Sequence, residues 1–148
     1  MEILIKNQQK TIKINQRKIR EIVKKVLHSL KVDEKTEVSI LFTDDKFIRS
    51  LNNKYRGIDK STDVLSFSLW EGSVITPESE SNKLLGDIII SVETVQRQAD
   101  NLSHSMEKEL TVLLIHGLLH LTGYVHEEDK DDKIMREKET EMLKIFYF

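Results

Sequence analysis

Residues 110–121 form an apolar run that is interrupted by two histidines. No other segment limits the possible folds of the chain as strongly. The composition of this run predicts a helix at the centre of the fold, buried on most of its surface. His116 and His120 stand four residues apart, so their imidazoles lie on one face of that helix. An unpaired polar group buried there would cost about 1–3 kcal/mol, so both side chains need a specific partner.

A third histidine, His126, follows six residues after His120, and together the three form the pattern HxxxHxxGxxH over residues 116–126. Gly123 stands where a helix end favours a left-handed residue, which lets the chain turn back toward the first two imidazoles. Three imidazoles with an open fourth position are typical of a catalytic zinc site. We therefore predict one zinc-like divalent ion per chain, held by His116, His120 and His126, and hydrolytic chemistry at it.

The composition limits the alternatives for this site. The chain contains no cysteine, which excludes disulfides, thiolate zinc sites and cysteine nucleophiles. Imidazole ligands also suit copper, nickel and iron, so zinc is the favoured ion and not the sole candidate. The other two histidines, His28 and His104, have no such neighbours and are expected to be ordinary structural residues.

The histidine spacing is also that of the metzincin proteases, HExxHxxGxxH, in which the glutamate is the general base. Here Gly117 takes the place of that glutamate, so a metallopeptidase is kept as the second interpretation. Three acids follow His126 and are candidates for a displaced base or for partners of the ligands, although an acidic helix start explains them equally well: Glu127, Glu128 and Asp129.

The hydrophobic pattern predicts a single α+β domain over residues 1–148, with a small four-stranded mixed sheet, about five helices, and the metal site on the central helix and the following turn. The predicted strands are 1–6, 38–43, 64–68 and 84–91. The predicted helices are 15–30, 44–55, 92–102, 105–121 and a last one with an apolar side of Ile134, Met135, Met142, Leu143 and Ile145. Residues 56–63 are expected to be a polar loop, and residues 71–83 a mobile connection.

Charge and hydropathy indicate the cellular setting. The formal net charge of -2 argues against binding nucleic acid by bulk charge, because neutralising phosphates needs many lysines and arginines. Residues 1–31 nevertheless hold nine lysines or arginines against two acids, which marks either a solvated helix face or a surface for an anionic substrate. No segment is long and apolar enough to span a membrane, and no secretory signal is visible, so a cytoplasmic location is expected.

Three blocks of the sequence resemble the YbeY-type bacterial rRNA maturation factors. Residues 51–56 (LNNKYR) with 62–67 (TDVLSF) look like the arginine loop and the following strand of that family, 85–88 (LGDI) like its second strand motif, and 116–126 (HGLLHLTGYVH) like its metal motif. The chain departs from the family at Val125, where an aspartate is common, and at Ser61 and Ser68, where proline is frequent.

The resemblance implies a zinc-dependent endoribonuclease that cleaves single-stranded RNA in ribosomal RNA processing and ribosome quality control, with the ribosome or a ribosomal protein as partner and no role for DNA or a membrane. It implies catalytic roles for His116 and Arg56, the latter facing the cleft of the metal ion. A guanidinium binds a phosphate bidentately and stabilises charge that develops on it. Without the motif context, Arg56 would be expected to cap a helix end or to pair with Asp59. A non-catalytic ribosome-assembly protein stabilised by its metal is the third interpretation.

Overall fold

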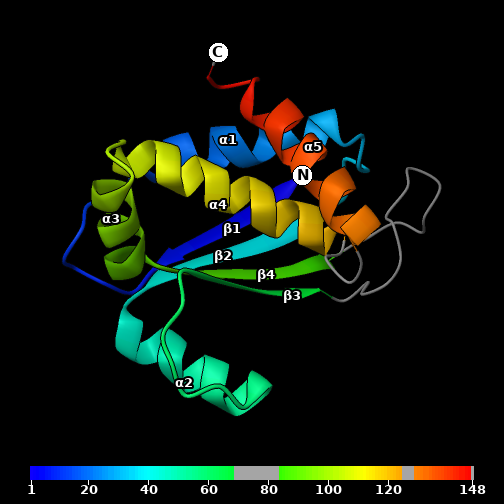
Figure 1. Ribbon diagram of the computed structural model, residues 1–148. Coiled ribbons are helices and arrows are strands. Elements are labelled where there is room, and N and C mark those ends of the chain that lie inside the picture. Colours follow the sequence, from blue (N-terminus) through cyan, green and yellow to red (C-terminus); the bar gives the residue numbers. More distant parts are fainter. Residues whose placement is uncertain (69–83, 125–128, 148) are drawn as a thin grey trace.

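The structure is a computed structural model that describes residues 1–68, 84–124 and 129–147. Within these residues four strands form one sheet in the order β1-β2-β4-β3 (Figure 1). The strands are β1 (Glu2–Asn7), β2 (Glu37–Thr43), β3 (Val64–Ser68) and β4 (Leu84–Ser91). β1, β2 and β4 run parallel, and β3 pairs antiparallel with β4 at one edge. The predicted mixed four-stranded sheet is confirmed.

Five helices are present in the described residues, as predicted: α1 (Gln16–Ser29), α2 (Asp45–Arg56), α3 (Val92–Asn101), α4 (Met106–Leu121) and α5 (Asp129–Leu143). The first four begin where a side-chain oxygen accepts a hydrogen bond from the third residue beyond it. The capping residues are Asn15, Asp44, Ser91 and Ser105. These local signals explain why the predicted helix starts agree closely with the observed ones.

The sheet separates two hydrophobic cores of unequal size. α1, α3, α4 and α5 cover one face, and α2 lies on the other (Figure 1). Ile88 and Ile90 of β4 point into the larger core, whereas Ile89 packs with Ile48 of α2 and Leu65 of β3 in the smaller one. β4 is thus covered on both faces, as its continuous apolar run predicts.

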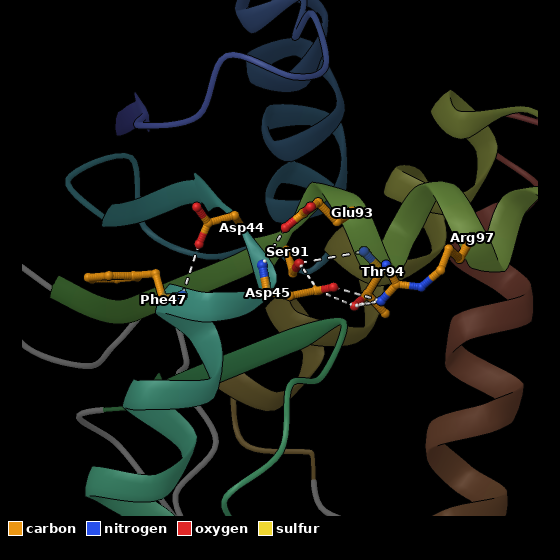
Figure 2. Close-up of polar contacts among 7 residues, drawn as sticks. All are labelled: Asp44, Asp45, Phe47, Ser91, Glu93, Thr94 and Arg97. Atoms are coloured by element: carbon orange, nitrogen blue, oxygen red, sulfur yellow. Dashed lines mark hydrogen bonds and ion pairs between the residues drawn. The ribbon is translucent and has the colours of Figure 1, made fainter.

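The N-terminus of α2 is fixed to the N-terminus of α3 by the carboxylate of Asp45 (Figure 2). Its Oδ1 accepts hydrogen bonds from Ser91 Oγ and Thr94 Oγ1, both at 2.6 Å, and its Oδ2 lies 2.8 Å from Arg97 Nη2. Burial alone raises the pKa of Asp45, but the hydrogen bonds from Ser91, Thr94 and Arg97 outweigh it and hold this pKa below its ordinary value. Below, these four residues are called the Asp45 cluster.

Two details of the predicted elements are wrong. Ile134 and Ile145 are 45% and 41% exposed, so the apolar side of α5 reduces to Met135 and Met142, with Leu143 half-buried. Ile145 falls after the end of α5 at Leu143, where the helical period no longer decides which way a side chain points. Arg56 belongs to the last turn of α2 and not to the loop that follows. The connection predicted over residues 71–83 lies outside the described residues.

Most basic side chains of residues 1–31 are exposed in the structure. Within the described residues, Lys18 pairs with Glu107 at 2.7 Å, and Arg17 lies 3.8 Å from Glu21. Arg20 donates a hydrogen bond to the carbonyl of Ile3.

In the described ranges, no helix combines the length and the apolar character that a membrane span requires.

Candidate active site

His116 and His120 face each other on α4. Their Nε2 atoms lie 3.1 Å apart, and their rings are nearly perpendicular, with centroids at 4.6 Å. Most of α4 is buried around them, and the side chain of His116 is 32% exposed. The two imidazoles therefore converge on one point of this face of α4, as their spacing in the sequence predicts.

Glu139 of α5 fixes the ring of His116. Its Oε1 lies 2.7 Å from Nδ1 of His116, and its side chain is 28% exposed. When this carboxylate accepts the Nδ1–H proton, the lone pair of the imidazole is on Nε2, which is the atom that faces His120. Glu139 therefore selects the tautomer that a metal ligand needs.

The sequence-based prediction missed Glu139 and placed its acidic candidates closer to the histidines. Of these, Glu127 and Glu128 lie outside the described residues, and Asp129 is an exposed residue in the first turn of α5. A signal for Glu139 does exist in the sequence. It stands four residues after Met135 and three before Met142, on the buried side of a helix, where an unpaired carboxylate is costly.

The end of α4 turns the chain back as predicted. Gly123 has a φ of +108°, and its N–H donates to the carbonyl of His120. The next N–H, of Tyr124, donates to Leu119, which closes the turn directly after the second histidine. The third predicted ligand, His126, and Val125 lie outside the described residues, so the role of His126 stays a prediction. Within the described ranges, no group of three or more potential metal ligands is found.

The packing of α4 on the sheet explains why position 117 is a glycine. A Cβ added to Gly117 would lie 3.0 Å from Cδ1 of Ile88 in β4. The glycine therefore lets α4 pack closely on the sheet, on a side of the helix other than the one that carries the histidines. A glutamate at this position would point into the core, where the general base of a metzincin protease has no place.

Arg56 lies on the α2 side of the sheet edge. Its Nη2 donates to the carbonyl of Ser66 in β3 at 3.2 Å, and its guanidinium lies 5.9 Å from the ring centroid of Phe67. Neither of the ordinary alternatives for this residue is observed. Arg49 binds Asp59 bidentately at 2.8 and 3.2 Å, and Gly57 caps the helix with a φ of +69°.

The edge strand β3 connects Arg56 with the end of α4. Ser66 accepts the bond from Arg56, and two residues further along, Ser68 Oγ lies 3.5 Å from the carbonyl of Leu121, the residue after His120. Two residues of a strand span about 7 Å. Arg56 and the histidines are thus on opposite faces of the sheet but next to the same short stretch of edge strand. That both face one cleft stays a prediction.

The remaining histidines have ordinary partners. Nε2 of His28 lies 3.0 Å from Glu34 at the surface, and Nε2 of His104 lies 3.0 Å from the buried carboxylate of Glu109. Both contacts join a single acid to a single histidine within a few residues of sequence, as expected for structural residues.

Comparison with known proteins decides the family. The family described as endoribonuclease YbeY matches residues 4–147. The chain belongs to the endoribonuclease YbeY family. The resemblance inferred from the motifs is confirmed, and with it the class of enzyme, a hydrolytic endoribonuclease.

Individual relatives agree with this assignment. A protein named endoribonuclease YbeY from Desulforamulus reducens is 45% identical over 146 residues, covering 97% of this chain and 95% of its own. Another of that name from Thermoanaerobacter sp. is 45% identical over 152 residues, covering 97% and 96%. The solution structure of TM1509 from Thermotoga maritima, 31% identical, covers 96% of this chain and 87% of its own with a TM-score of 0.64.

The strand motif of the YbeY family at residues 85–88 also has a structural explanation. Gly86 has a φ of +142°, and a Cβ there would lie 2.0 Å from the carbonyl oxygen of Phe67 in β3. Leu121 of α4 lies against the same position, at 3.1 Å from that Cβ. Only glycine fits between the edge strand and the end of the histidine-bearing helix.

Proposed function

We propose that this chain is a metal-dependent endoribonuclease that cleaves single-stranded RNA in ribosomal RNA processing and ribosome quality control. The proposal includes a cytoplasmic location and the ribosome or a ribosomal protein as the partner that presents the substrate. It also treats residues 1–148 as one catalytic domain. The observation that carries it is the convergence of Nε2 of His116 and His120 beside Glu139.

The donor geometry suits a tetrahedral ion. Two zinc–nitrogen bonds of about 2.0–2.1 Å at the tetrahedral angle separate their nitrogens by about 3.3 Å. The two Nε2 atoms lie 3.1 Å apart, and the Nδ1 of His116 already has its acceptor. We assign His126 as the third ligand, on the spacing of the sequence motif, and zinc as the favoured ion.

Each residue has a separate task in phosphodiester cleavage. A bound divalent ion supplies charge that polarises the scissile phosphate and lowers the pKa of water. His116 and His120 orient their lone pairs toward that position, and Glu139 keeps His116 in the required tautomer. Arg56, held by the carbonyl of Ser66 and lying next to the ring of Phe67, directs its remaining N–H groups to the phosphate, which a planar guanidinium binds bidentately.

The test combines metal analysis with RNA cleavage. Protein purified without chelator or nickel resin should contain about one zinc per chain, and it should lose cleavage of a single-stranded RNA on chelation and regain it with zinc. His116→Ala and Arg56→Ala should each lower the rate at least 100-fold, since they remove a ligand and a charged transition-state contact. His28→Ala, which removes an exposed histidine outside the site, is the matched control and should cleave at the parental rate.

Three results would contradict the proposal. Cleavage by His116→Ala at the parental rate would assign the activity to a contaminant. Metal loss that lowers thermal stability without any cleavage by the metal-loaded parent would favour the non-catalytic assembly protein. Peptide cleavage by the loaded protein, with none of RNA, would favour the peptidase.

A further inference from the structure

The last turn of α2 presents an exposed aromatic ring next to the arginine of the proposed site. Tyr55 is 59% exposed, although it is a large side chain in direct contact with another aromatic residue. Its ring meets Phe67 of β3 edge to face, with centroids 5.5 Å apart and an angle of 65°. Phe67 in turn packs against the smaller core beneath α2. The exposed ring of Tyr55 is therefore held against a side chain that is itself packed on the core.

Two cations of α2 lie next to this aromatic pair, and the exposed Asp87 of β4 is in register with Phe67. The Nζ of Lys54 lies 5.2 Å from the centroid of Tyr55, and the guanidinium of Arg56 lies 5.9 Å from that of Phe67. Among the described residues, neither Lys54 nor Arg56 forms an ion pair. Their charge is thus available to an anionic ligand, and three consecutive residues, 54–56, together supply two cations and a π-face.

We propose that Tyr55, supported by Phe67, is a stacking subsite for one base of the single-stranded RNA, with Lys54 and Arg56 binding the phosphates beside it. Aromatic rings flanked by cations are the means by which proteins bind unpaired nucleotides without reading their sequence. The strand then passes over the edge of β3, between Ser66 and Ser68, toward His116 and His120. This inference rests on the proposed function and adds a binding subsite outside the metal ligands.

Binding to two labelled oligonucleotides of equal length and charge tests the subsite. One is a 2′-O-methyl oligoadenylate, and the other has the same backbone with abasic positions; a gel confirms that both remain intact. Tyr55→Ala should bind the oligoadenylate about tenfold more weakly, as expected for the loss of one base–aromatic stack, and should bind the abasic strand as the parent does. Tyr55→Trp, which keeps a π-face, should bind the oligoadenylate at least as tightly as the parent.

The matched control is Tyr147→Ala, which removes a tyrosine that lies over Lys108 on the other side of the molecule. It should bind both strands as the parent does. The stacking subsite is overturned if Tyr55→Ala weakens the binding of both oligonucleotides equally, or of neither. The proposed function survives that result if the parent still cleaves RNA and His116→Ala does not. A parent that neither binds nor cleaves RNA overturns both.

Discussion

At the scale of single residues, we expect the contact between His116 and Glu139 to strengthen metal binding at the proposed site. Carboxylates that accept the second ring N–H of a ligand histidine typically contribute 10- to 100-fold in metal affinity. Glu139→Gln keeps the size of the side chain but replaces the charged acceptor by a neutral amide. We expect zinc affinity to fall about tenfold, as measured by competition with a chromogenic chelator.

The neighbouring Glu141 provides the control for this prediction. It lies on the same helix, its side chain is 66% exposed, and its Oε1 lies 3.4 Å from Nζ of Lys138. Glu141→Gln should bind zinc as the parent does. Equal affinities for the Glu139 variant and the parent would mean that another group orients His116.

The two kinds of residue differ in how far the sequence reveals them. His116 and His120 are predictable because a helix of fixed period places them on one face. Glu139 is separated from His116 by 23 positions, and its contact depends on how α5 packs on α4. Arg56 was found from a motif, yet its bond to Ser66 and its place over Phe67 follow from the tertiary structure.

At the scale of elements, the Asp45 cluster fixes the orientation of α2, the helix that carries Tyr55 and Arg56 at its other end. Asp45→Asn removes the charge that Arg97, Ser91 and Thr94 bind. Because the pKa of Asp45 is lowered by folding, its stabilisation is fully present above the unfolded-state pKa of about 4 and is lost as pH falls through the folded-state pKa.

We therefore expect Asp45→Asn to lower the free energy of unfolding by about 1–2 kcal/mol at neutral pH, and by progressively less as the pH falls below about 4. Urea unfolding of both proteins across this range measures the difference. Asp44→Asn is the control, because asparagine also caps a helix well and should leave stability within about 0.5 kcal/mol of the parent. A pH-independent loss in the Asp45 variant would point to altered packing instead of charge.

Element boundaries were predictable here and element positions were not. Asn15, Asp44, Ser91 and Ser105 are local signals, since each cap acts within one helical turn. The strand order β1-β2-β4-β3 and the placement of α2 alone on its face depend on contacts between segments distant in sequence. No periodicity in the chain specifies such contacts.

At the scale of the whole molecule, four helices, α1, α3, α4 and α5, share one core with the sheet, and the predicted single α+β domain agrees with this architecture. With His126 as its proposed third ligand, the metal would link α4 to the chain beyond it. Ligands that bind only the folded state stabilise it by mass action, so the ion should stabilise the entire domain and not one helix.

Free zinc at about 100 times its dissociation constant adds about 2.7 kcal/mol to the free energy of unfolding. A domain of this size gains about 2–4 °C per kcal/mol, so calorimetry should show one cooperative transition whose Tm rises by about 5–10 °C with zinc and returns on chelation. His28→Ala should shift as the parent does, and His116→Ala should not shift. An equal shift in His116→Ala would place the stabilising ion elsewhere, and two separated transitions would contradict a single domain over residues 1–148.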